Sequence, residues 1–448
     1  MTGMEISQAE DLLAAGAVAL RDRLAQGRLT AVELVTACLT VIAAREPEIQ
    51  AWAWLDADHA LAQAEALDRR RAAGAALGPL HGLPVGLKDV IDTAGMPTEN
   101  GTPADAGRVP QRDAWIVARL RAAGAVILGK TVTTEMAFLH PSRTRNPWNT
   151  AHSPGGSSAG SAAAVGAGMV PLAVGTQTGG SVIRPAAYCG AVGFKPSFGA
   201  IPRTGVLLQS HTLDTLGVFA RAAADAALIA EVLFGHDPQD SATRPLPVPA
   251  LNDAARGEGP APRLAFLPPP QYDLADPEMV GKLEAFAAGL EGCETLPPLP
   301  DLEPAVEVRT RINAAEMAKY YAGYNDRHRD LLSEEMTAFL DSGNAVRALD
   351  YLADLDWRGR LNAQLDDIFD RCDAVLTPAT TGPAPEGFAT TGNAVYNGIW
   401  TLCGTPAITL PLTRASNGLP LGLQLVGRRG EDARLMRVAA WIERRIAG

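Results

Sequence analysis

Lysine and aromatic residues are both scarce in this chain of 448 residues. Aromatic residues make up 5% of the sequence, and only five of its 39 basic residues are lysines. Arginine keeps its proton near pH 7, whereas a desolvated lysine can lose it and act as a base. Each retained lysine is therefore a candidate for chemistry; the five are Lys88, Lys130, Lys195, Lys282 and Lys319.

The chain also lacks an excess of positive charge, long apolar runs and paired cysteine motifs. Its formal net charge of −11 disfavours a nucleic-acid partner, because phosphate binding needs clustered lysine and arginine. No apolar run reaches the ~18 residues that would span a membrane, and the N-terminus MTGMEISQAEDLL carries acids where a secretory signal carries bases. Five cysteines without a CxxC spacing fit a reducing compartment. We therefore expect a cytoplasmic enzyme with no nucleic-acid or membrane partner.

Motifs for metals and common cofactors are missing as well. The closest two histidines, His140 and His152, are 12 positions apart, so the H-E-x-x-H zinc arrangement is absent. Gly155 to Gly160 is followed by Ser161 where a P-loop needs lysine, and Gly166-Ala167-Gly168 is followed by Met-Val-Pro, which breaks the dinucleotide fingerprint. We predict no cofactor and no metal, although an all-carboxylate metal site would leave no such spacing and stays open.

The feature around which the chain is organised is an almost uncharged stretch, Pro154 to Pro196. Two Gly-Gly-Ser steps lie in it, ending at Ser157 and Ser181. Glycines before a serine leave backbone N–H groups uncovered, which a developing oxyanion needs. A single step of this kind is more often a turn beside a small-residue helix, but the pair favours a catalytic site.

Lys88 lies inside an apolar run, Leu83 to Val90, that is typical of a strand buried on both faces. Such a lysine either extends its ammonium to solvent or is held for its chemistry. Asp89 and Asp92 follow closely, and pairing with either of them would favour the charged form of Lys88.

Other serine arrangements fit less well. Ser158 formally matches the G-x-S-x-G nucleophile elbow of α/β-hydrolases, but the elbow needs an apolar strand directly before it, and here Asn149 to Pro154 precedes it. No lysine has a serine three positions before it, so the S-x-x-K motif is absent. A serine–lysine pair must therefore form over a long sequence distance.

The remaining chain alternates strand and helix patterns, which is typical of an α/β protein. Helical spacing is expected at 6–73, 113–123, 158–168, 214–233, 306–370 and 432–446, and strands at 83–90, 126–129, 170–174, 190–194, 264–267, 374–376, 407–410 and 421–426.

These motifs together resemble the amidase signature family. The likeness rests on GLPVGLKDVIDTAG, GGSSAGSAAAVGAG, GTQTGGSVIRPAAYCG and GFKPSFG, and continues in DAVLTPA, GTPAITLPL and GLPLGLQLVGRRGEDARL. It implies one large α/β domain over 1–448, with a mixed central sheet flanked by helices. Within it we expect an N-terminal helical wrap (1–73), a signature core (74–240), a variable helical excursion (241–372) and closing strands with a last helix (373–448).

The resemblance also implies a catalytic triad, with Ser181 as nucleophile, Ser157 as bridging serine after a cis peptide bond, and Lys88 as base. It implies an oxyanion hole built from the backbone N–H groups of Thr178, Gly179, Gly180 and Ser181.

Two departures from the common family pattern concern the substrate. Position 177 is glutamine where aspartate is common, and the arginine follows the nucleophile by three positions, as Arg184. Both look most like the malonamidase-like branch, in which an arginine can bind a substrate carboxylate. Arg184 is thus a candidate for substrate binding, with a structural ion pair as its other role.

The expected reaction is hydrolysis of a carbon–nitrogen bond in a small carboxamide through an acyl-enzyme, with release of ammonia or an amine. Esters, carbamates or urethanes are further substrate classes that the family accepts. The alternatives are an amidase-type subunit of a glutamine-dependent amidotransferase complex and an α/β-hydrolase-like esterase. A binding protein on an inactive scaffold is disfavoured because all three triad positions are intact. A homodimer is one assembly that the sequence allows.

Overall fold

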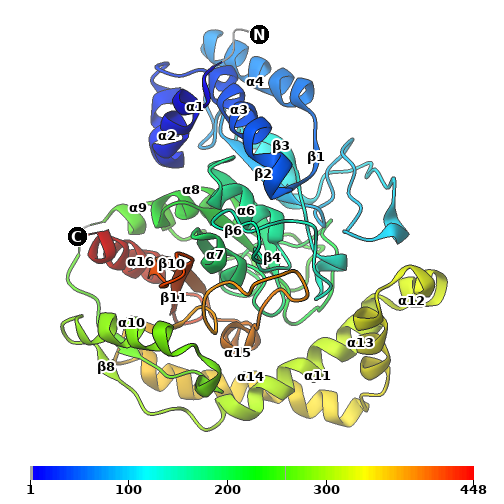
Figure 1. Ribbon diagram of the computed structural model, residues 1–448, viewed down its shortest axis with the longest axis vertical. Coiled ribbons are helices and arrows are strands. Elements are labelled where there is room, and N and C mark those ends of the chain that lie inside the picture. The colour runs from blue at the N-terminus through cyan, green and yellow to red at the C-terminus, as the bar shows by residue number, and fades with distance from the viewer. Residues whose placement is uncertain (1–3, 258, 448) are drawn as a thin grey trace.

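A computed structural model describes residues 4–257 and 259–447 (Figure 1). Its centre is an 11-stranded sheet, counted over those residues, with the strand order β1-β3-β2-β4-β6-β5-β10-β11-β9-β7-β8. The strands are β1 Trp52–Leu55, β2 Pro84–Lys88, β3 Val126–Thr131, β4 Leu172–Gln177, β5 Val192–Lys195, β6 Thr215–Ala220, β7 Leu264–Phe266, β8 Glu294–Thr295, β9 Ala374–Pro378, β10 Ala407–Arg414 and β11 Pro420–Val426.

The sheet is mixed. β2 pairs in parallel with β3 and β4, and β7 pairs in parallel with β8 and β9. The pairs between these two ends are antiparallel, from β4–β6 through β11–β9. The expected fold class is confirmed, since the protein is a single α/β domain with a large mixed sheet flanked by helices.

Helices from both halves of the chain lie around the sheet (Figure 1). Those of the first half are α1 Ile6–Ala14, α2 Gly16–Ala25, α3 Ala31–Ile49, α4 Ala57–Ala72, α5 Trp115–Ala122, α6 Ala159–Gly166, α7 Ile183–Cys189 and α8 Ala223–Leu233. Those of the second half are α9 Leu251–Arg256, α10 Pro277–Ala288, α11 Leu302–Tyr320, α12 Ala322–His328, α13 Glu334–Asn344, α14 Ala348–Phe369, α15 Val395–Cys403 and α16 Asp432–Ala447. None of the described helices is long and apolar enough to cross a membrane.

The N-terminal region is mostly helical, as the sequence predicts. Thr30 and Glu33 form a reciprocal capping box at the start of α3, in which each side chain accepts a hydrogen bond from the other residue's backbone N–H. The helical pattern did not predict strand β1, which lies between α3 and α4 and pairs antiparallel with β3. The N-terminal helices are therefore tied to one edge of the sheet.

The prediction of helix over 214–233 is wrong for its first part. Residues 215–220 form β6, which is buried along its whole length between β4 and β5, and α8 begins only at Ala223. The sequence TLGVFA is apolar on both faces, as a central strand requires, and such a short run has no periodicity that separates strand from helix.

Helix α6 places the first Gly-Gly-Ser step in the core. It consists of alanine, glycine, serine and valine, and all but its last residue are buried. A Cβ atom on Gly160 would lie 2.2 Å from the carbonyl oxygen of Ala51 and 2.4 Å from the backbone nitrogen of Val132. Only glycine permits this approach, which holds the start of α6 against the backbone that adjoins β1 and β3.

Helices α11, α13 and α14 form a layer beside α15 at the lower edge of the view in Figure 1. Buried side chains of α11, including Val308 and Ile312, pack with Trp400 of α15 in one apolar cluster. This contact brings one face of α11 close to the loop that ends at Ser181.

Candidate active site

Lys88 is the last residue of β2, and its side chain is completely buried. Its Nζ atom lies 2.7 Å from the Oγ atom of Ser157 and 2.8 Å from the Oγ1 atom of Thr176. Burial lowers the pKa of Lys88 to about 7, against the opposing effect of the Asp214 carboxylate. The lowered pKa favours the uncharged amine, which is the form that a general base requires.

The two acids that follow Lys88 in the sequence pair with other residues. Asp89 lies 3.4 Å from the Nζ atom of the buried Lys130, and Asp92 forms an ion pair with Arg108. The suggested pairing of Lys88 with Asp89 or Asp92 is therefore not present.

Ser157 is also buried and follows a cis peptide bond from Gly156, as the family resemblance implied. Its carbonyl oxygen accepts a hydrogen bond from the backbone N–H of Thr134. The Cβ atom of a residue larger than glycine at position 156 would lie 2.9 Å from methyl groups of Thr134 and Thr391. Backbone and side-chain contacts together fix the position from which the Ser157 hydroxyl reaches Lys88.

Ser181 lies in the turn between β4 and α7 and is buried. Three residues later, Arg184 donates hydrogen bonds to the carbonyl oxygens of Gly156 at 2.8 Å and Gly392 at 2.9 Å. Arg184 thereby joins the helix that follows Ser181 to the loop that carries Ser157.

The turn before Ser181 is the predicted oxyanion hole. Gln177 accepts hydrogen bonds from the backbone N–H groups of Val182 and Ile183, which caps the start of α7. Among the residues that the structure describes, no acceptor is found for the N–H groups of Gly179, Gly180 and Ser181. Gln177, which stands where the family commonly has aspartate, therefore has a structural role. The N–H groups of Gly179, Gly180 and Ser181 stay available to an anion.

Thr178, the first residue of this turn, is held by its side chain. Its Oγ1 atom donates to the Asp214 carboxylate at 2.6 Å. Asp214 also accepts from the backbone N–H groups of Gln209 and Ser210. Burial raises the pKa of Asp214 to about 6, and these hydrogen bonds oppose the rise. The Asp214 carboxylate therefore holds the Thr178 turn through a hydrogen bond and acts on Lys88 through its charge.

Arg184 and Arg309 both line a cavity of about 470 Å³, and they approach Gly156 and Gly179 respectively. Lys88, Ser157 and Ser181 are not among the lining residues of this cavity. Arg184 is buried, and its Nε atom has no hydrogen-bond partner among the described residues. Burial lowers the pKa of Arg184 to about 10. The other nitrogens of this guanidinium bond to Gly156, Thr391 and Gly392, so Arg184 has a structural role whether or not it also meets a substrate.

A family model described as Amidase matches residues 33–436 of the chain. The chain belongs to the amidase signature family.

Its relatives include a glutamyl-tRNA(Gln) amidotransferase subunit from Chloroflexus aggregans, 36% identical over 93% of either chain. Among solved structures, the peptide amidase of Stenotrophomonas maltophilia has a TM-score of 0.83 and 31% identity, covering 96% of each chain. The 6-aminohexanoate cyclic dimer hydrolase has a TM-score of 0.84 and 26% identity, covering 97% of this chain and 98% of that one. As a member of this family the chain is a hydrolase of carbon–nitrogen bonds other than peptide bonds. Its place in the malonamidase-like branch stays a prediction.

The amidase contains one candidate binding residue that the sequence did not indicate. Arg309 lies on α11, and its guanidinium is 3.0 Å from the position that a Cβ atom of Gly179 would take. Its one hydrogen bond among the described residues is a long contact of 3.4 Å to Thr310. Burial and the neighbouring Arg184 lower the pKa of Arg309 to about 10. Nothing in the sequence separates it from the other arginines, because only the packing of α11 brings it to this cavity.

Ser158, the serine that matches the G-x-S-x-G pattern, is directed toward strand β4 of the sheet. The Ser158 Oγ atom donates to the carbonyl oxygen of Thr176 and accepts from the N–H of the same residue. Ser158 is fully buried, and its Oγ atom is 2.5 Å from the position that a Cβ atom of Gly175 would occupy. Its hydroxyl is committed to the backbone of β4, which argues against Ser158 as nucleophile.

Proposed function

We propose that the chain hydrolyses a small carboxamide through an acyl-enzyme on Ser181, with Ser157 and Lys88 as the proton relay. The observation that carries this proposal is the contact between the buried Lys88 amine, whose pKa is lowered to about 7, and the Ser157 hydroxyl 2.7 Å away. A neutral lysine that can accept a proton from a serine is a general base.

In the first half-reaction, the Oγ atom of Ser181 attacks the carbonyl carbon of the amide. Its proton moves to Ser157, whose own proton moves to the Nζ atom of Lys88. The oxyanion forms against the N–H groups of Thr178 to Ser181. As the carbon–nitrogen bond breaks, the relay runs backwards and protonates the leaving amine. An ester of Ser181 remains.

In the second half-reaction, water attacks that ester. Its proton passes through Ser157 to Lys88, and the relay returns a proton to Ser181 as the acid leaves. The same sequence of steps would cleave an ester or a carbamate, since it requires only an acyl carbon and a leaving group.

The substrate that fits the cavity carries a negative charge on its acyl side. Arg184 and Arg309 both line the cavity, and neither forms an ion pair with a carboxylate among the described residues. Glu335 is the one acid in the described lining; it is exposed, and its carboxylate lies 3.3 Å from the Nδ1 atom of His140. Two guanidiniums without a counter-ion beside the candidate oxyanion hole favour an amide whose acyl group ends in a carboxylate.

A second candidate function is supported by the relatives that are subunits of glutamyl-tRNA(Gln) amidotransferases. In that case the same relay would release ammonia from glutamine within a larger complex. The purified chain separates the two functions. Steady hydrolysis of small acid amides without any partner supports the first, and activity that appears only with partner proteins supports the second.

The reaction itself is tested by trapping the nucleophile. Incubation with a fluorophosphonate followed by peptide mapping should place the adduct on Ser181, and Ser181→Ala should lose both the adduct and turnover. Ser158→Ala is the control, and it should still be labelled. An adduct that maps to Ser158 in the native protein would overturn the assignment of Ser181.

A further inference from the structure

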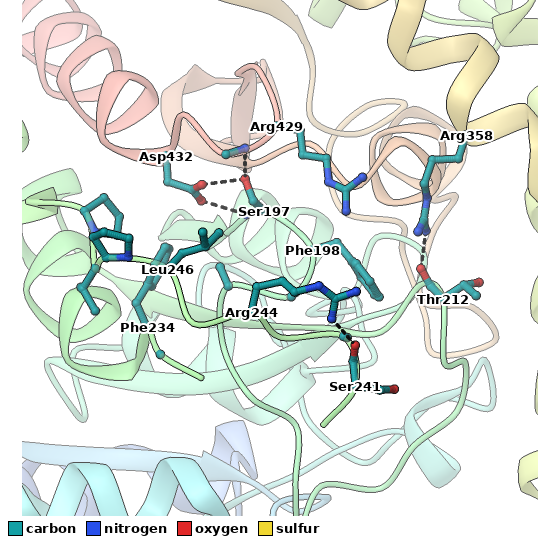
Figure 2. A pocket seen from close by; sticks show the side chains of 18 of the residues that line it. Ser197, Phe198, Thr212, Phe234, Ser241, Arg244, Leu246, Arg358, Arg429 and Asp432 are labelled. Atoms are coloured by element: carbon teal, nitrogen blue, oxygen red, sulfur yellow. Dashed lines mark hydrogen bonds between the residues drawn. The ribbon is translucent and has the colours of Figure 1, made fainter. Parts of the chain in front are cut away.

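A second cavity of about 410 Å³ lies elsewhere in the molecule and shares no lining residue with the candidate active site (Figure 2). Six chain segments line it. They are the loop after β5 from Ser197 to Ala200, residues 211–212, residues 234–235, the stretch between Ser241 and Pro249, the residue Arg358 of α14, and the stretch from Arg429 to Asp432, the first residue of α16. Its volume falls in the lower part of the range of about 300–1,000 Å³ that small-molecule sites occupy.

One side of this cavity is cationic. Arg244, Arg358 and Arg429 come from three separate segments, and Figure 2 draws their guanidiniums on the side of the cavity where Phe198 lies. Arg358 stacks on that ring with its guanidinium carbon 4.9 Å from the ring centre. His211 adds a fourth basic group to the lining.

The three arginines have spare hydrogen-bonding capacity. Arg244 donates from one nitrogen to the carbonyls of Ser241 and Thr243, and Arg358 donates to the carbonyls of Leu402 and Thr212. All these acceptors are neutral. Over residues 4–257 and 259–447, none of the three guanidiniums forms an ion pair, and Arg429 makes no hydrogen bond.

Two acids lie in or beside the lining, and both make other contacts. Asp432 accepts hydrogen bonds from the N–H and the hydroxyl of Ser197 and interacts with the buried Lys195. Glu316 lies behind the lining and accepts from the hydroxyls of Ser210, Thr212 and Tyr351. The charge of Glu316 acts on Arg358 and offsets part of its positive charge. The three guanidiniums still leave an excess of positive charge on this side of the cavity.

The opposite side of the cavity is apolar and open. It consists of Phe234, Leu246, Pro247, Val248 and Pro249. Leu246 is 73% exposed and Val248 is 47% exposed, so this apolar surface has no cover from the chain itself. A ligand that fills the cavity would bury it and gain free energy from doing so.

We propose that this cavity binds a small organic acid, whose carboxylate is held by Arg429, Arg244 and Arg358 and whose apolar body packs on Leu246 and Phe234. Arg358 is fixed by its carbonyl contacts and by stacking, so it is pre-positioned for a carboxylate. The free Arg429 closes on the same carboxylate from the other side. The ligand is a small molecule because six chain segments line the cavity. It is an anion because the three guanidiniums outnumber the carboxylates beside them, of which Asp432 also interacts with Lys195.

The test measures binding by calorimetry at low ionic strength with naphthalene-2-carboxylate. Naphthalene-2-methanol has the same apolar body without the charge, and acetate has the charge without the body. We expect the carboxylate to bind at least about tenfold more tightly than either, because charge-assisted hydrogen bonds and apolar burial both contribute.

Variants locate the site. Arg244→Gln/Arg429→Gln should weaken binding of naphthalene-2-carboxylate by about tenfold or more. Arg112→Gln/Lys319→Gln is matched in charge, and both its positions are exposed and outside the cavity; it should leave affinity within about twofold. Arg309→Gln, which changes the candidate active site, should also leave it unchanged.

Three results would overturn the proposal. They are binding weaker than about 1 mM, equal binding of the uncharged alcohol, and a loss of affinity in Arg309→Gln that is absent in Arg244→Gln/Arg429→Gln. The last result would mean that the probe enters the candidate active site. Because the readout is binding, none of these results depends on whether Ser181 is the nucleophile.

Discussion

The Nζ atom of Lys88 lies 2.7 Å from the Oγ atom of Ser157, although the two residues are 69 positions apart in the sequence. Within the described chain Lys88 forms no ion pair, and Thr176 supplies its other hydrogen bond. A lysine in such surroundings exchanges protons with a hydroxyl rather than holding a carboxylate.

The first prediction is that kcat/KM rises with pH through an ionisation near 7, the value to which burial lowers the pKa of Lys88. The sign follows from the role, because the amine accepts a proton only when neutral and is protonated below its pKa. Lys88→Ala should lower kcat/KM by at least ~10², the lower range of general-base catalysis. The pH–rate profile of an acid amide between pH 5 and 9 measures both effects.

Lys88→Arg is the informative control, since it keeps the positive charge but a guanidinium does not give up its proton in this range. It should be as inactive as Lys88→Ala. Near-native activity in Lys88→Arg would show that the residue supplies charge, and the proton relay would have to be abandoned.

The second prediction concerns Arg309. Arg309→Gln should raise KM for amides with a carboxylate on the acyl side by about 10- to 100-fold, which corresponds to the loss of a charge-assisted hydrogen bond. Amides with a neutral acyl group should be hydrolysed as before. Lys319→Gln removes one charge from an exposed position of the same helix and should change neither. If Arg309→Gln raised KM equally for acidic and neutral amides, the role of Arg309 would be structural, in support of the turn from Thr178 to Ser181.

The third prediction concerns stability. Gly160→Ala should lower the free energy of unfolding by about 3 kcal/mol, because the new methyl group meets backbone atoms of Ala51 and Val132 that have no freedom to move aside. In Gly281→Ala, inside α10, the new methyl group has no atom within 4 Å. This variant should raise the free energy of unfolding by about 0.5–1 kcal/mol. Denaturant unfolding of the two variants measures the contrast. A tolerated Gly160→Ala would mean that α6 shifts away from the sheet edge without cost.

The sequence was informative wherever local chemistry determines structure. The apolar run around Lys88 predicted a buried strand, and that strand is β2, which begins and ends slightly inside the predicted range. The helical spacing of the N-terminal region likewise predicted helices there, and α1 to α4 form within it. The motif spacing also led to the family, which the match over 33–436 confirms.

What the sequence did not reveal depends on contacts between distant segments. β6 is a strand because β4 and β5 flank it, and its own residues favour neither structure. Asp89 was expected near Lys88, but successive strand residues point to opposite faces, and it meets Lys130 on the neighbouring strand. Arg309 reaches the candidate site only through the packing of α11 on α15.

The unequal use of lysine and arginine has a practical consequence for handling the protein. Lys88, Lys130 and Lys195 are completely buried, whereas Lys319 is exposed and Lys282 is partly exposed. Lysine-directed acylating reagents, cross-linkers and resins therefore meet two accessible side chains in the folded chain, one on α10 and one on α11. A surface coupled through lysine would hold each molecule by α10 or by α11, both in the lower part of the view in Figure 1, whereas the N-terminal helices lie at its top.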